Sequence, residues 1–195
     1  MAETGTFLQG WLTRALRRES PNFNARPQAD VSLLVIHNIS LPPGQYGQGC
    51  VERFFCNELD FDSHPAFSDI RDMQVSAHFL IERDGRLLQF VSTQARAWHA
   101  GVSSFEGRDN CNDFSIGIEL EGCDSEAYTG AQYGQLVALT RDIMQEYPGI
   151  TTERVVGHAD IAPGRKTDPG TAFDWSRYRA MLTGRATGAA SGAET

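Results

Sequence analysis

The hydrophobic positions of the chain fall into short runs that are typical of the strands of a buried sheet. Residues 31–37 contain an unbroken aliphatic run with polar ends, which predicts a buried strand that closes at His37. Residues 77–83 and 86–91 flank an Asp-Gly pair at 84–85, and two apolar segments around Asp-Gly predict a β-hairpin.

Two later segments also predict strands. Residues 115–121 alternate, so that three aliphatic residues share one face and the small or acidic residues Gly117, Glu119 and Glu121 share the other. Residues 154–158 predict a short strand that closes at His158. Two histidines are therefore expected at strand ends, and the loops that follow strands are where sites of α/β proteins commonly form.

Helical patterns lie between and after these strands. Residues 50–57 predict a short helix, and apolar residues recur at helical spacing over 133–147, where Thr129 can serve as the N-cap. Asp174 can cap a final helix over 175–182. Strands mixed with helices predict an α/β (α+β) single domain, with a central mixed β-sheet flanked by helices.

The chain divides into three parts by pattern. Residues 1–30 are expected to form an N-terminal arm packed on the domain, and residues 31–182 the domain that carries the chemistry. Residues 39–49 are rich in proline and glycine and predict a long loop that borders the cleft, either as a lid or as a rigid connection. The Gly/Ala/Thr-rich residues 183–195 are expected to be disordered.

Composition narrows the classes of protein. The 195 residues are 41% hydrophobic and 22% charged, which is ordinary for a globular protein, and the net charge of −8 argues against nucleic acid as a partner. Neither a secretory signal nor an apolar run that could span a membrane is visible, so a cytoplasmic location without a membrane partner is expected. In that compartment the four cysteines, Cys50, Cys56, Cys111 and Cys123, are expected to be free thiols.

One lysine stands out against this composition. Sixteen of the 17 basic residues are arginine, and the exception, Lys166, lies between His158 and Asp168. An ammonium group is a compact point charge that a planar guanidinium does not replace, which favours a specific role for Lys166 over chance.

Two histidines and one carboxylate can bind zinc and leave a fourth position open for water, as catalytic zinc sites do. His37, His158 and Asp168 form one such set, but spacing alone does not favour His37 over His78 or His99. Glu119 is a candidate general base if its strand face lines a cleft, and an ordinary surface residue if that face meets solvent.

The sequence resembles the AmpD-type N-acetylmuramoyl-L-alanine amidases, a zinc amidase group shared with phage lysozyme-like amidases and peptidoglycan recognition proteins. The resemblance spans about residues 10–182 and rests on five segments: 32–44, 75–81, 96–103, 111–122 and 157–170. It implies the zinc amidase / peptidoglycan recognition protein-like fold and one Zn²⁺ per chain, held by His37, His158 and Asp168. It implies Glu119 as the base and Lys166 as the group that stabilises the oxyanion.

The resemblance also implies a substrate and its contacts. Water would attack the lactyl carbonyl of (1,6-anhydro)-N-acetylmuramic acid and release L-alanine with its stem peptide, in cytoplasmic peptidoglycan recycling. Asn38, Trp98 and His99 would line the cleft. Some relatives carry arginine where this chain has Gln74 and Asn110, and Arg108 or Arg165 would then contact the peptide in their place.

Two other functions remain open from the sequence. A periplasmic amidase would act on polymeric peptidoglycan, and a peptidoglycan-binding module would lack catalysis, although all three implied ligands are present here. The leading prediction is a monomeric enzyme with a small soluble muropeptide as substrate.

Overall fold

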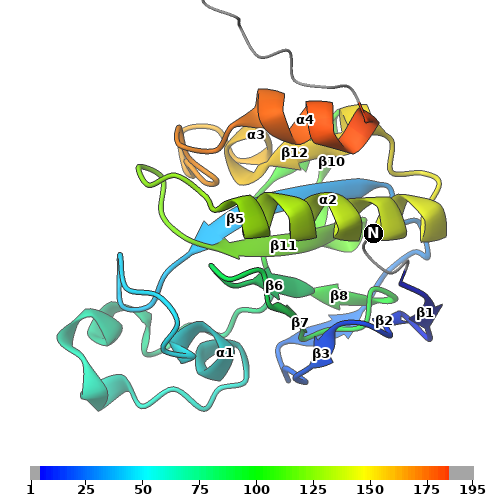
Figure 1. Ribbon diagram of the computed structural model, residues 1–195. Helices are drawn as coiled ribbons and strands as arrows, with labels where there is room; N and C mark the ends of the chain where they lie inside the picture. Colours follow the sequence, from blue (N-terminus) through cyan, green and yellow to red (C-terminus); the bar gives the residue numbers. More distant parts are fainter. Residues whose placement is uncertain (1–4, 185–195) are drawn as a thin grey trace, which may run out of the picture.

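The computed structural model describes residues 5–184, and its centre is a six-stranded mixed sheet (Figure 1). In spatial order its strands are β12 (Val155–Gly157), β5 (Leu33–Ile39), β11 (Ser115–Glu121), β6 (Phe79–Ile81), β7 (Leu87–Gln89) and β3 (Leu16–Arg17). The first four run parallel, β7 is antiparallel to β6, and β3 is parallel to β7. The predicted single-domain mixed α/β class is confirmed.

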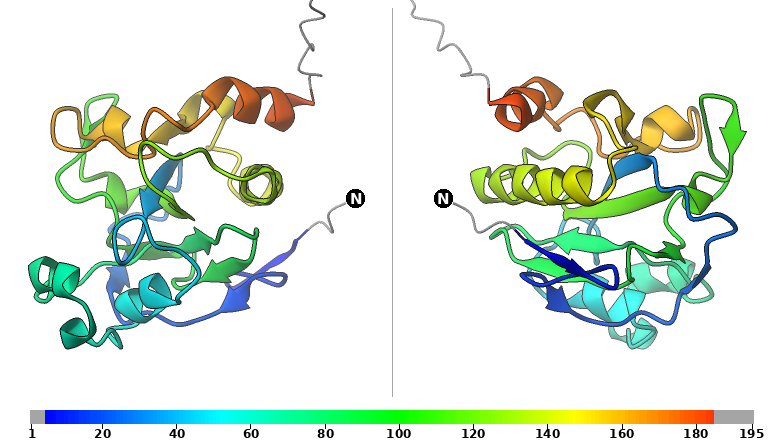
Figure 2. Two further views of the ribbon diagram at one scale, coloured as in Figure 1. Left: turned by 60° about the vertical axis from the view of Figure 1, so that its left-hand side comes forward. Right: turned by 90° about the vertical axis from the view of Figure 1, so that its right-hand side faces the viewer.

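One face of the sheet is covered by α2 (Gly130–Glu146) and α4 (Trp175–Thr183), which lie side by side in Figures 1 and 2. Ile116, Ile118 and Leu120 pack into this layer, as the alternation of their strand predicts. Thr129 caps α2 through a capping box, in which its hydroxyl accepts from Gln132 N at 3.0 Å and the Gln132 Oε1 accepts from Thr129 N at 3.1 Å.

The opposite face is covered in two separate places. Over β6 and β7, an apolar cluster contains α1 (Cys50–Phe55), with Phe54 and Phe55 against Leu80 and Leu88. Over β5 and β12, a second cluster brings together Leu33, Val35, Phe114 and Ile161, among others. His37 of β5 and its partner Glu119 of β11 lie on this same face.

The remaining elements are short. They are the strand pairs β1 (Phe7–Leu8) with β2 (Trp11–Leu12), β4 (Phe23–Ala25) with β8 (Ala95–Ala97), and β9 (Ser104–Phe105) with β10 (Arg108–Asp109), the 3-10 turns η1 (Phe61–Ser63), η2 (Pro65–Ile70), η3 (Cys111–Asp113) and η4 (Thr152–Arg154), and α3 (His158–Ile161). No helix of the described part of the chain is both long and apolar enough to cross a membrane.

The N-terminal residues are more than an attached arm. β3 forms the outer strand of the main sheet, and the Leu12 N–H donates to Gln89 Oε1 at 2.7 Å. The side chain of Gln89 also donates to the Gly10 carbonyl, at 2.7 Å. Two-residue strands carry no local pattern, which is why the sequence did not predict this pairing.

Several element ends differ from the predictions; β6 and β7, for example, are shorter than the predicted strands 77–83 and 86–91. β5 continues to Ile39, because its parallel pairing with β11 extends past His37. His158 follows β12 as the first residue of α3 and so does not belong to the strand. Thr183 is the last residue of α4, so the predicted tail would start later, and its residues 185–195 lie outside the described part.

Candidate active site

The register between β5 and β11 sets the position of the candidate site. Glu119 is the direct partner of His37 in this parallel pair. Partnered residues on neighbouring strands point to the same face of a sheet, about 4.8 Å apart along the hydrogen-bonding direction. Glu119 therefore lies beside His37 on the face that α2 and α4 leave free, and the alternative that its face meets solvent is wrong.

Three potential metal ligands converge at this point. His37 Nδ1 lies 2.9 Å from His158 Nδ1, and Asp168 Oδ2 lies 3.0 Å from each of these two nitrogens. The three residues come from β5, from the start of α3 and from the loop after α3. His78 and His99, the alternatives that spacing left open, are not part of this triangle.

At pH 7 the side chains of the triangle have lone pairs that could bind a cation. Burial lowers the pKa of His37 to about 4, which keeps the ring neutral at pH 7. Burial opposes ionisation of Asp168, but its contacts with His158 and His37 outweigh burial, so the pKa of this carboxyl lies well below its ordinary value. An ionised carboxylate between two imidazole nitrogens is an arrangement that a cation would stabilise.

The donor set fits a metal ion such as zinc. His158 Nε2 lies 3.0 Å from the carbonyl oxygen of Ala100, which can only accept, so a neutral His158 has an unprotonated Nδ1. Tetrahedral zinc at about 2.0–2.1 Å from its ligands requires ligand atoms about 3.3 Å apart, close to the separations here. His37, His158 and Asp168 form a group that can hold one metal ion.

Glu119 differs from most buried carboxylates of the protein. Its side chain is only 9% exposed, and Oε2 has no hydrogen-bond partner among the described residues. Burial raises the pKa of Glu119 well above its ordinary value, the negative charge of Asp168 raises it further, and Lys166 lowers it. A buried carboxyl with free capacity and a raised pKa is typical of a group that exchanges protons with a substrate or water.

These residues share a cleft of about 260 Å³. The predicted residues His37, Asn38, Trp98, His99, Glu119, His158, Lys166 and Asp168 all line it. The lining also includes Leu41, from the loop expected to border the cleft, and the apolar residues Phe54, Ile70, Met73 and Val75, which the sequence did not single out as site residues. Their signal was weak, because isolated apolar residues between 54 and 75 have no strand or helix periodicity.

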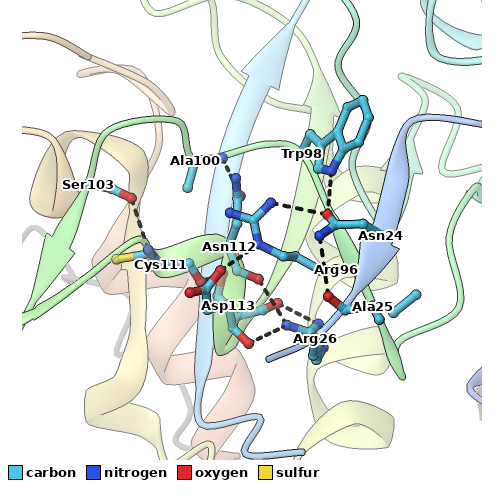
Figure 3. Close-up of polar contacts among 12 residues, drawn as sticks. Asn24, Ala25, Arg26, Arg96, Trp98, Ala100, Ser103, Cys111, Asn112 and Asp113 are labelled. Carbon is cyan, nitrogen blue, oxygen red and sulfur yellow. Dashed lines mark hydrogen bonds and ion pairs between the residues drawn. The ribbon is translucent and has the colours of Figure 1, made fainter. Parts of the chain in front are cut away.

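The predicted substrate residues in the cleft have protein partners that fix their orientation. The indole Nε1 of Trp98 donates to Asn24 Oδ1 at 2.7 Å, as Figure 3 shows. Asn38 Nδ2 donates to Asp124 Oδ1 at 2.8 Å. The His99 ring lies so close to Gly117 that a Cβ on this residue would come within 2.5 Å of it.

Two other predicted substrate residues lie outside the lining of the cleft. Arg108 donates to Asp30 at 2.7 Å, and its guanidinium lies over the Phe114 ring, 3.9 Å from the centroid. Arg165 donates to the carbonyl oxygens of Ala100 and Val102, both at 2.6 Å. Both guanidinium groups thus have protein partners, and Arg165 Nη2 also lies 3.4 Å from Nε2 of the cleft residue His158. Contact of either arginine with a substrate stays a prediction.

The loop over 39–49 borders the cleft only at its beginning. Ile39 and Leu41 line the cleft, whereas Tyr46, Gly47 and Gly49 line a separate hollow. The Gly47 N–H donates to Glu121 Oε1 at 2.7 Å, so this loop is anchored to the end of β11.

Comparison with known proteins identifies the family to which this chain is similar. The family model described as N-acetylmuramoyl-L-alanine amidase matches residues 27–171. The chain is 57% identical over 171 residues to a protein of Haemophilus influenzae, a match that covers 87% of this chain and 93% of the relative. It is 54% identical over 175 residues to one of Salmonella typhimurium, covering 89% and 93%. Both relatives are named 1,6-anhydro-N-acetylmuramyl-L-alanine amidase AmpD.

Solved structures agree with these sequence matches. A crystal structure of a selenomethionine derivative of AmpD superposes with a TM-score of 0.88 at 52% identity, covering 91% of this chain and 99% of the other. The amidase AmiD of Escherichia coli, solved with the substrate anhydro-N-acetylmuramic acid-L-Ala-D-γ-Glu-L-Lys, gives 0.56 at 32% identity, covering 90% of this chain and 65% of AmiD. With its sheet, its cleft and its His/His/Asp triangle, the chain belongs to the N-acetylmuramoyl-L-alanine amidase family.

Proposed function

We propose that this enzyme uses zinc to hydrolyse the amide bond between the lactyl group of 1,6-anhydro-N-acetylmuramic acid and the L-alanine of the stem peptide. Support comes from the names of relatives that match nearly the whole chain at 54–57% identity. The observation that carries the mechanism is Glu119 Oε2 beside the His37, His158 and Asp168 triangle, because this oxygen has no hydrogen-bond partner within residues 5–184.

The chain's residues divide the work of the reaction. His37, His158 and Asp168 would hold zinc, which when bound polarises a carbonyl and lowers the pKa of water. Glu119 accepts a proton as water attacks the lactyl carbonyl, and later delivers it to the departing amine of L-alanine. The C–N bond breaks and a C–O bond forms, which yields a carboxylate on the sugar and a peptide with a free N-terminus.

Lys166 has a separate role in this proposal. It lines the cleft next to the triangle and lowers the pKa of both His37 and Glu119 by its charge. Its ammonium would stabilise the negative charge that develops on the carbonyl oxygen during attack. Trp98 and Asn38, whose orientations are fixed by Asn24 and Asp124, would contact the sugar and the peptide.

The proposed place of this reaction is the recycling of soluble wall fragments in the cytoplasm. Mass spectrometry of products from purified anhydro-muropeptide and from intact sacculi, each with and without chelator, tests it. We expect release of stem peptide from the soluble fragment and its loss with chelator. Preferential release from sacculi would favour the periplasmic alternative, and no release from either substrate would favour a binding module.

Metal content tests the ligand assignment independently of activity. His37→Ala and Asp168→Ala should lose most of the bound zinc, because each removes one of three protein ligands. His64→Ala is the matched control, since this histidine caps η2 through its contact with Ala66 N and lies away from the triangle. Full zinc occupancy in both ligand variants would contradict the assignment.

A further inference from the structure

The two histidines of the triangle are held in different ways at their second ring nitrogen. His158 Nε2 faces the Ala100 carbonyl at 3.0 Å, which can only accept. Arg165 Nη2 lies farther from this nitrogen, at 3.4 Å, and donates instead to the Ala100 and Val102 carbonyls, so a neutral His158 carries its proton on Nε2. His37 Nε2 faces another imidazole, with His99 Nδ1 at 2.9 Å. Either ring could donate in such a pair, so this contact alone does not decide which nitrogen of His37 carries the proton.

Ser115 removes the ambiguity. Its hydroxyl oxygen lies 2.5 Å from the Cys111 carbonyl oxygen, and two oxygens come this close only with a proton between them. The carbonyl has no proton to give, so the serine donates here. The same hydroxyl oxygen lies 3.2 Å from His99 Nε2 and can only accept from it.

The order of donors then follows ring by ring. A neutral His99 that donates from Nε2 has an unprotonated Nδ1, which must accept from His37 Nε2. His37 is then unprotonated at Nδ1, the atom that faces His158 Nδ1 and Asp168 Oδ2. The opposite order would put a proton on His37 Nδ1, where it would bond to Asp168 and occupy the position that a metal requires.

We propose that Ser115 and His99 form a hydrogen-bond relay that fixes the tautomer of His37 and so prepares its Nδ1 for the metal ion. Both are positioning residues that act through His37. For His99 this replaces the expected contact with sugar or peptide as its main role. The inference rests on the proposed function only in that the triangle is taken to bind a metal.

The residues around the relay hold its side chains in place, and burial keeps water from replacing their hydrogen bonds. Ser115 is fully buried and His37 is 1% exposed. Gly117 provides the space for the His99 ring, because a Cβ there would lie within 2.5–2.8 Å of three ring atoms. Asn112 Oδ1 accepts from the backbone N–H groups of His99 at 3.1 Å and Ala100 at 2.8 Å.

Asn112 therefore supports both halves of the triangle. One side chain positions the ring that His37 contacts and the carbonyl that His158 contacts, as Figure 3 shows for Ala100. Hydrogen-bond partners of metal-binding histidines typically change metal affinity about 10- to 100-fold when they are removed. An effect of this size is expected for the loss of His99 as an acceptor.

Two substitutions of His99 distinguish a relay from simple packing. His99→Leu fills space but offers no acceptor to His37 Nε2, whereas His99→Asn keeps an acceptor oxygen near the position of Nδ1. We expect zinc affinity, measured by competition with a chelator, to fall about 10- to 100-fold in His99→Leu. His99→Asn should recover most of this loss, and Ser115→Ala should give an intermediate loss because His99 then has no fixed order.

The tautomers themselves provide a second readout that needs neither activity nor zinc. Long-range ¹H–¹⁵N spectra of the metal-free wild-type protein should show His37 and His99 protonated at Nε2, and His37 should shift toward Nδ1–H in His99→Leu. Protonation of wild-type His37 at Nδ1, or wild-type zinc affinity in a folded His99→Leu protein, would overturn the relay. If wild-type protein binds no zinc, the proposed function fails, while the spectra still decide the relay.

Discussion

Two successive positions on one face of β11 contain the same residue type with opposite hydrogen bonding. Glu121, 5% exposed, accepts from the Gly47 N–H at 2.7 Å and from the Arg83 N–H at 3.3 Å. Glu119, two residues earlier and 9% exposed, has an oxygen with no partner among the described residues. Burial is nearly equal at the two positions, so the difference lies in the backbone donors around them.

This contrast separates a structural carboxylate from a reactive one. Glu121 joins the loop over 39–49 to the hairpin of β6 and β7, and its hydrogen-bonding capacity is used by the protein. Glu119 retains capacity for water or substrate. An unpartnered buried polar group costs stability, and such costs are commonly kept at functional sites.

The largest effect on turnover is expected from substitution of Glu119. Glu119→Gln preserves shape but removes the proton acceptor, so turnover should fall about 100- to 10,000-fold. Zinc content and thermal stability should remain close to wild type or above, because a neutral amide is easier to bury than a carboxylate. Steady-state hydrolysis of anhydro-muropeptide and metal analysis measure both. Turnover within a few-fold of wild type would show that Glu119 is not the base.

Lys166→Arg examines the charge next to the reactive carboxylate. A guanidinium spreads its charge over a planar fork and cannot occupy the place of an ammonium. We expect turnover to fall about 100- to 1000-fold with normal zinc content, as for the loss of one oxyanion partner. Arg17→Lys, on the surface beside Glu19, is the control for arginine–lysine exchange. Equal turnover of the two variants would remove the proposed role of Lys166.

Substitution of Glu121 should lower the stability of the protein and change turnover little. In Glu121→Gln the amide oxygen can still accept from Gly47, but the NH₂ group then faces the Arg83 N–H, which also donates. Leaving such a donor without an acceptor costs about 1–3 kcal/mol of unfolding free energy, measurable by urea denaturation. If Glu121→Gln lost more turnover than Glu119→Gln, Glu121 would be the proton acceptor and Glu119 the structural carboxylate.

A smaller difference is expected in the acid response of the metal-free protein. Burial lowers the pKa of His37 to about 4, whereas the unfolded chain binds this proton near pH 6.5. The folded protein therefore loses stability as the pH falls from about 6.5 to about 4. Burial raises the pKa of Glu119 above 4.5, so the folded protein binds this proton first, and stability is gained as pH falls.

Glu119→Gln should therefore lose stability more steeply than wild type between pH 6.5 and 4.5. Urea midpoints at several pH values in the presence of chelator provide the measurement. Parallel curves for the two proteins would show that the pKa of Glu119 is the same in the folded and unfolded chains.

Local pattern was sufficient for parts of the fold and of the site. The alternation of 115–121 separated its apolar face from its acidic face, and the N-cap positions at Thr129 and Asp174 are confirmed by their hydrogen bonds. The pairing of His37 with Glu119 could not be read in this way, because the order of strands in a sheet depends on contacts between residues far apart in the chain.

The supporting residues were harder still to predict. Ser115 and Asn112 are common small polar residues, and nothing in their spacing indicates that they contact the partners of His37 and His158. Conversely, Arg108 was expected to replace the arginines of some relatives at the substrate; the structure shows it stacked on Phe114 and paired with Asp30, and its contact with substrate stays a prediction. Charge indicates what a side chain can bind and does not indicate where it lies.

The distribution of the triangle along the chain has a consequence for synthesis on the ribosome. His37 and Glu119 belong to the two central strands, but His158 and Asp168 are translated only after both strands and α2 have been made. Domains commonly begin to fold while the chain is still growing. A nascent chain can therefore assemble the middle of its sheet before the triangle exists, and no truncated product that stops before Asp168 has the complete triangle.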